Sequence, residues 1–130
     1  MMTPELTALT LAALLQCAQM TLYSVLGNAQ AGTKAALSPR DRKFELTGMA
    51  GRVQRAMNNH FEGLILFGIA ATVIAVSDQS TRFTAVCAWT YLAARVLYVP
   101  AYAFGLVPWR SVVWGVGWIA TFLMLIAALL

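Results

Sequence analysis

Four long apolar segments constrain the fold of this chain more than any other feature. Residues 6–26 and 112–130 carry no charge, and each approaches the roughly 20 apolar residues that a helix needs to cross a bilayer. Residues 56–76 and 83–104 are apolar apart from a few polar positions. The chain is 11% charged, against about 25% in an ordinary soluble domain. We therefore predict an all-α membrane protein, a bundle of four transmembrane helices, rather than a soluble monomer.

The predicted helices cover residues 6–26, 49–76, 82–104 and 109–130, within one integral membrane domain that spans residues 1–130. Their connections differ in charge. Of the nine basic residues, six lie in the long first connection, residues 27–55: Lys34, Arg40, Arg42, Lys43, Arg52 and Arg55. Arg82 alone lies in the second connection, and Arg110 in the third. The positive-inside rule then places the first and third connections in the cytoplasm and both termini outside.

The composition also limits the partners. A net charge of +4 could indicate nucleic acid, but 60% hydrophobic content favours a membrane, so we expect no nucleic-acid partner. The two cysteines, Cys17 and Cys87, are too far apart for a redox or zinc motif. The single histidine, His60, has no second histidine with which to share a metal. We expect no metal site, and a hydrogen-bonding or interfacial role for His60.

Polar residues interrupt the second predicted helix at regular intervals. Arg52, Arg55, Asn59 and Glu62 are separated by three, four and three residues, which places them on one helical face. Ionisable residues inside membranes are costly and usually functional. The stripe is either a salt-bridged contact between helices or the wall of a polar cavity.

The third predicted helix carries a second stripe, with Tyr91, Arg95, Tyr98 and Tyr102 separated by four, three and four residues. Glu62 lies about 21 Å from the turn that joins the two helices, and Arg95 about 20 Å, at 1.5 Å per residue. Because opposite charges at equal depth attract, we predict that Glu62 and Arg95 form an ion pair.

The fourth predicted helix opens with Pro108, Trp109, Arg110 and Ser111. A helix N-terminus carries partial positive charge, and an arginine beside it can stabilise a bound thiolate. Alternatively, Arg110 only reaches toward lipid headgroups. Trp109, Trp114 and Trp118 are expected at the interface and in packing. With Arg52, Arg55, Asn59, Tyr98 and Tyr102, this helix start would form a cationic pocket open to the cytoplasm, suited to a small polyanion.

Three motifs in this order resemble those of the MAPEG family, the membrane-associated proteins in eicosanoid and glutathione metabolism. The first is R-x-x-R-A-x-x-N-x-x-E, carried by Arg52, Arg55, Ala56, Asn59 and Glu62. The second is R-x-x-H/Y-x-x-x-Y, carried by Arg95, Tyr98 and Tyr102, and the third is P-x-R-S, carried by Pro108, Arg110 and Ser111.

The resemblance implies a homotrimer that holds glutathione at subunit interfaces and meets a lipophilic second substrate from the bilayer. It implies Arg110 and Ser111 as catalytic residues, with Arg110 stabilising the glutathione thiolate. The implied glutathione-binding residues are Arg52, Arg55, Asn59, Glu62, Arg95, Tyr98 and Tyr102. A chain this short resembles bacterial members, which implies an enzyme of the bacterial inner membrane.

Three hypotheses follow. The first is a glutathione-dependent transferase or peroxidase that acts on lipophilic electrophiles or lipid hydroperoxides. The second is a catalytically silent, lipid-binding trimer of the same fold. The third is a small proton-coupled exporter that uses Glu62, which the predicted pairing of Glu62 with Arg95 disfavours.

Overall fold

The computed structural model describes residues 2–31 and 46–130, and this part of the chain contains helices and no strand. The helices are α1 (Pro4–Ala31), α3 (Gly48–Val76), α4 (Arg82–Ala103) and α5 (Trp109–Leu129). The shortest, α5, has 21 residues, and all four are long and apolar enough to cross a membrane. For the described residues, the prediction of an all-α architecture with four helices suited to cross a membrane is confirmed.

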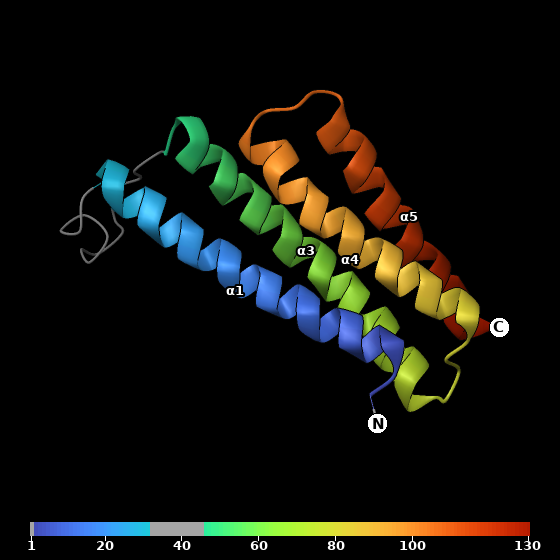
Figure 1. Ribbon diagram of the computed structural model, residues 1–130. Coiled ribbons are helices and arrows are strands. Elements are labelled where there is room, and N and C mark those ends of the chain that lie inside the picture. The colour runs from blue at the N-terminus through green and yellow to red at the C-terminus, as the bar shows by residue number, and fades with distance from the viewer. Residues whose placement is uncertain (1, 32–45) are drawn as a thin grey trace.

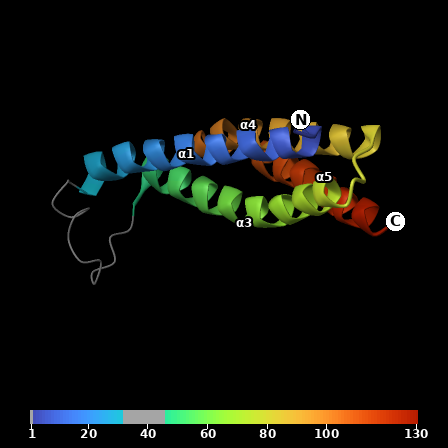
Figure 2. The same ribbon diagram turned by 90° about the horizontal axis from the view of Figure 1, so that it is seen from below.

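The four helices run side by side, and consecutive helices point in opposite directions (Figure 1). Helix α1 packs on α3 and α4, and α5 packs on α4 and α3. Seen from below, α1 and α4 form one layer and α3 and α5 the other (Figure 2). Both chain ends lie at the end of the bundle that carries the α3–α4 turn, and the α4–α5 turn lies toward the opposite end (Figure 1).

Small side chains dominate the contact between the helices. The buried core contains Ala8 and Ala12 of α1, Ala70 and Ala71 of α3, and Ala88 of α4. In a membrane, small residues allow helix backbones to approach closely, and van der Waals packing then holds the helices together. The large residues of the core are few: one pair, Phe67 and Tyr91, stacks with ring centroids 4.0 Å apart and planes 11° apart.

Helix α1 is longer than the predicted residues 6–26. At its start, the Thr3 hydroxyl accepts a hydrogen bond from the Leu6 N–H at 3.2 Å. At its end, the Gln30 amide pairs with the backbone of Thr47, as acceptor at 2.7 Å and donor at 3.0 Å. This pairing ties the end of α1 to the start of α3, so the helix continues past Gly27 instead of ending there.

Helix α3 begins at Gly48, so Arg52 and Arg55 belong to this helix, as the predicted helix over residues 49–76 implied. The other basic residues assigned to the first connection, Lys34, Arg40, Arg42 and Lys43, lie outside the described residues.

The turn that joins α4 to α5 has a well-defined helix C-cap. The N–H of Leu106 donates to the carbonyl of Ala101 at 2.8 Å, and the N–H of Gly105 donates to that of Tyr102 at 3.0 Å. This is the Schellman arrangement, which needs a left-handed residue after the cap. Gly105 supplies it with φ of 65°. The chain therefore reverses within a few residues and returns α5 against α4.

Candidate functional site

A polar cavity of about 300 Å³ lies among α3, α4 and α5, near the α4–α5 turn. Its volume is at the lower end of the range for small-molecule sites, about 300–1,000 Å³. The lining residues are Asn59, Tyr98, Tyr102, Arg110, Ser111 and Trp114. Five of these six are residues that the sequence motifs single out, and they come from three different helices.

Helical spacing explains why these residues meet. Tyr98 and Tyr102 lie four residues apart on α4, so they occupy one face of its last turns. Arg110, Ser111 and Trp114 occupy the first turns of α5. The tight turn at Gly105 brings the end of one helix beside the start of the other.

Three arginines surround the two tyrosine rings. The guanidinium carbon of Arg95 lies 4.4 Å from the ring centroid of Tyr98, and that of Arg110 lies 5.1 Å from the centroid of Tyr102. Arg55 lies on the same Tyr102 ring at 5.8 Å, and its Nε donates to the Tyr102 hydroxyl at 3.1 Å. Cation–π contacts stabilise these charges without cancelling them.

No acidic side chain is among the six lining residues, so the cavity keeps its positive potential. Such a cavity suits an anionic ligand.

The first turn of α5 offers a ligand mainly side chains, because its backbone N–H groups are already hydrogen-bonded. The N–H groups of Arg110, Ser111 and Val112 donate to the carbonyls of Leu106 and Pro108, at 3.0–3.2 Å. A ligand near this helix end would therefore meet the Arg110 guanidinium, the Ser111 hydroxyl and the helix dipole.

Arg95 is 3% exposed, and its bonding partners differ from those predicted. Its Nη1 donates to Oδ1 of Asn59 at 2.9 Å, and its Nε donates to Nδ1 of His60 at 3.1 Å. Glu62 is exposed. The predicted Glu62–Arg95 ion pair is therefore wrong for the described chain. The prediction used depth alone. Asn59 and His60 bond to Arg95 of α4, and Gly63 also lies close to Arg95. Glu62 is rotated about 100° from Gly63 around the axis of α3, so it points elsewhere.

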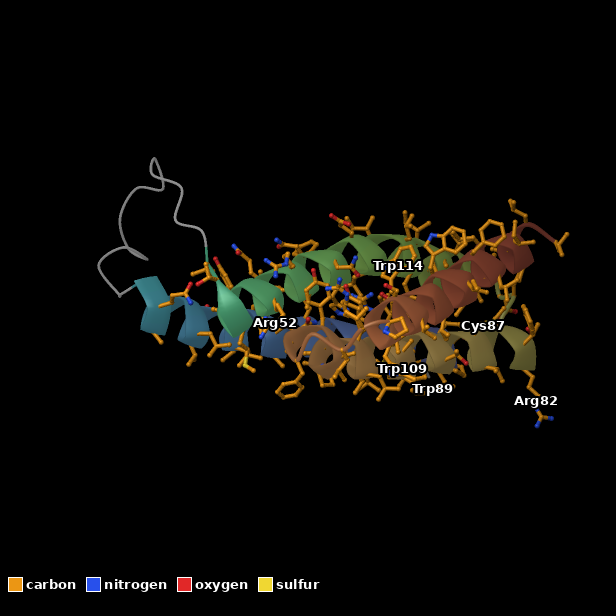
Figure 3. The ribbon with its side chains drawn as sticks, turned by 90° about the horizontal axis from the view of Figure 1, so that it is seen from above. Arg52, Arg82, Cys87, Trp89, Trp109 and Trp114 are labelled. Atoms are coloured by element: carbon orange, nitrogen blue, oxygen red, sulfur yellow. The ribbon has the colours of Figure 1, made fainter. Side chains whose placement is uncertain are left out.

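The remaining sequence candidates lie outside the cavity. Arg52 donates from Nε to the carbonyl of Ala103 at 2.8 Å, and so caps the C-terminal end of α4. It lies near one end of the bundle, and Arg82 lies near the other (Figure 3). Arg55 reaches Tyr102 from the exposed side, and Glu62 contributes nothing to the cavity lining.

Two residues near the cavity were given other roles from the sequence. Trp114, which we assigned to packing or the interface, lines the cavity on α5. Its spacing of four residues from Arg110 was the available signal, because such pairs share a helix face. His60 has the predicted hydrogen-bonding role, but in the buried interior and with Arg95 as a partner.

A family model described as the MAPEG family matches residues 8–130, nearly the whole chain. Neither a curated protein nor a solved structure matches the chain significantly. The family match agrees with four helices suited to cross a membrane and with the order of the three motifs. The chain therefore belongs to the MAPEG family, a group of membrane proteins related to eicosanoid and glutathione metabolism.

Proposed function

We propose that this protein is a membrane-bound, glutathione-dependent transferase or peroxidase that acts on lipophilic electrophiles or lipid hydroperoxides. The observation that carries the proposal is the cavity in which Arg110 and Ser111 face Asn59, Tyr98 and Tyr102. Glutathione is an anionic tripeptide with carboxylates, amides and a thiol. The cavity offers a cation, hydroxyls and an amide for those groups.

Arg110 and Ser111 would act on the sulfur. A positive charge and a hydroxyl donor favour the thiolate over the thiol, and the thiolate is the nucleophile. In conjugation, the thiolate forms a carbon–sulfur bond as the leaving group departs with its bonding electron pair. In peroxide reduction, the thiolate takes the terminal hydroxyl of the hydroperoxide as the O–O bond breaks, which gives a sulfenic acid and an alkoxide. The alkoxide becomes an alcohol by taking up the proton that the thiol released when it ionised. A second glutathione then reduces the sulfenic acid, forming a disulfide and water.

The outer face of α5 supports entry of the second substrate from the bilayer. Trp114, Trp118 and Phe122 follow one another at intervals of four residues and are exposed. Trp118 and Phe122 stack with ring centroids 5.5 Å apart. This aromatic face begins at the cavity wall and continues along α5, so a lipophilic molecule can approach the sulfur without crossing water.

Assembly and orientation follow from the same proposal. A homotrimer would place the exposed Arg55 and Glu62 beside a neighbouring subunit, where both could contact its glutathione. Arg52, Arg55 and Arg110 lie at or near the cavity end, and Arg82 begins α4 at the opposite end. By the positive-inside rule, the cavity then faces the cytoplasm and both termini lie outside. The resemblance to short bacterial members favours a bacterial inner membrane.

The test is an ultraviolet titration of the purified protein with glutathione, which follows thiolate absorbance. S-methylglutathione is the matched control, because it fills the same cavity but cannot ionise at sulfur. We expect a saturable signal with glutathione alone, together with turnover of chlorodinitrobenzene or a fatty-acid hydroperoxide. Absence of both the signal and turnover would contradict the proposal.

The same assays separate the alternatives. A lipid-binding trimer without activity would bind fatty acids and show no thiolate signal. The exporter hypothesis needs a protected proton site, but Glu62 is exposed and outside the cavity. Proton-driven drug efflux that Glu62→Gln abolishes would favour it instead.

A further inference from the structure

Arg95 is a buried cation that needs a defined set of partners. Burying a guanidinium is costly unless hydrogen bonds replace the water that it loses. Arg95 donates from Nε to His60 and from Nη1 to Asn59, at 3.1 and 2.9 Å. Its Nη2 has no hydrogen-bond partner within residues 2–31 and 46–130. The orientation of the guanidinium therefore depends on His60 and Asn59.

His60 is 0% exposed and is bonded at both ring nitrogens. Its Nε2 lies 2.9 Å from the carbonyl oxygen of Ala12 on α1, and its Nδ1 lies 3.1 Å from Nε of Arg95. A carbonyl only accepts and a guanidinium only donates. Nε2 must therefore carry the proton and Nδ1 must accept, so these contacts select one neutral tautomer of the ring.

Arg95 connects His60 to the cavity. The Asn59 oxygen that accepts from Arg95 belongs to a residue of the cavity wall. With that oxygen engaged, the Asn59 amide NH₂ group remains to donate to a ligand. Tyr98, the ring against which Arg95 packs, is also part of the wall.

We propose that His60 is a positioning residue: it holds Arg95 so that Asn59 presents its amide NH₂ and Tyr98 its ring to the ligand. His60 itself does not line the cavity. The proposal rests on the proposed function, since the ligand is taken to be glutathione. Its physical basis, the chain from Ala12 through His60 and Arg95 to Asn59, is independent of the ligand.

Two substitutions separate the contacts of His60. In His60→Asn, the amide oxygen takes the approximate place of Nδ1, so the acceptor for Arg95 remains and the bond to Ala12 is lost. In His60→Gln, the amide nitrogen takes the approximate place of Nε2, so the bond to Ala12 remains and the acceptor for Arg95 is lost. Both variants are uncharged and polar.

The measurement is the glutathione dissociation constant of each full-length variant, by thiolate titration. We expect His60→Gln to raise it about tenfold and His60→Asn to leave it within about threefold. In turnover assays, the change in His60→Gln should appear in KM and not in kcat. The reverse ranking would assign His60 to helix packing, and equal affinities for both variants and the wild type would also overturn the proposal.

A second variant covers the case in which His60→Gln fails to fold. Asn59→Asp keeps an acceptor for Arg95 and removes the two amide donors, so it should fold and bind glutathione at least about tenfold more weakly. Wild-type affinity in this variant would overturn the role given to Asn59.

One test needs no glutathione. Because His60 is the only histidine, nitrogen NMR of histidine-labelled, untagged protein reports on that ring alone. We expect the neutral tautomer protonated at Nε2, with the Nδ1 signal changing in Arg95→Met. The opposite tautomer would overturn this proposal, whether or not the wild-type protein binds glutathione. Absence of glutathione binding would instead contradict the proposed function.

Discussion

A charged residue is buried toward each end of the bundle, but the two residues differ in how fully they are hydrogen-bonded. Near the chain termini, Glu5 is 0% exposed and accepts hydrogen bonds from the hydroxyls of Ser80 and Thr84. Glu5 lies in the first turn of α1, and Thr84 lies near the N-terminus of α4, where helix dipoles favour an anion. Nearer the other end, Arg95 keeps an unused donor beside a polar cavity.

In our proposal, Glu5 is a structural charge, and Arg95 supports the site that binds the ligand. Glu5 joins α1 to the α3–α4 turn with short hydroxyl side chains that fill the space around it. The arginines near the cavity contact tyrosine rings and an amide. Those neutral groups do not balance the positive charge of the arginines. A ligand with negative charge would complete the second arrangement and has no place in the first.

The largest effect is expected from removing the charge at the cavity. Arg110→Ala should lower kcat/KM for conjugation by about 100-fold or more, as for the loss of a donor to a developing anion. It should also weaken the thiolate signal in the glutathione titration. Arg82→Ala is the matched control, because Arg82 is an exposed arginine at the opposite end. Equal losses in the two variants would show that net charge, not the cavity, matters.

At the end of the bundle near the chain termini, Glu5→Ala should destabilise the fold by about 2 kcal/mol, because Ser80 and Thr84 lose their buried acceptor. Denaturant titration in detergent measures the loss. Glutathione affinity should not change, since Glu5 lies at the other end of the bundle from the cavity. A variant with normal stability and reduced affinity would reverse the roles that we assign to the two ends.

Within the cavity, Ser111→Ala should have a smaller effect than Arg110→Ala. Loss of one neutral hydroxyl donor costs about 1 kcal/mol, or roughly fivefold in kcat/KM. Initial rates at low glutathione give the value. Ser77→Ala, at the exposed start of the α3–α4 turn, controls for the loss of any surface hydroxyl. An unchanged rate in Ser111→Ala would remove Ser111 from the mechanism.

The smallest effect is expected from a substitution in the α3–α4 turn. Asp78 has φ of 57°, where Gly105 stands in the corresponding turn with φ of 65°. Asp78→Gly should relieve the left-handed strain and stabilise the protein by about 0.5 kcal/mol after the added backbone entropy of glycine. Denaturation midpoints measure the shift, and activity should be unchanged. A destabilised variant would mean that the Asp78 side chain supports the turn.

Much of the fold followed from local sequence. Four apolar segments of sufficient length predict four membrane-spanning helices, because a backbone in lipid must satisfy its own hydrogen bonds. The ends were less predictable, since the extension of α1 depends on Gln30 pairing with Thr47, a contact between distant residues.

The candidate site was also predictable in part, because helical spacing is a local property of the sequence. Spacing placed Tyr98 and Tyr102 on one face of α4, and a tight turn brought that face beside Arg110 and Ser111 at the start of α5. The partner of Arg95 was not predictable from depth, because depth says nothing about which way a helix is rotated toward its neighbour.

By itself, the sequence determined the number of helices, their antiparallel order and the polar stripes along them, because these depend on the composition and period of one segment at a time. Only the tertiary structure decided that Arg95 bonds to His60 and Asn59 rather than Glu62, and that Trp114 joins the cavity. Those outcomes depend on the rotation of each helix about its axis. Packing among small side chains such as Ala12 and Ala88 sets that rotation, through contacts that no single segment contains.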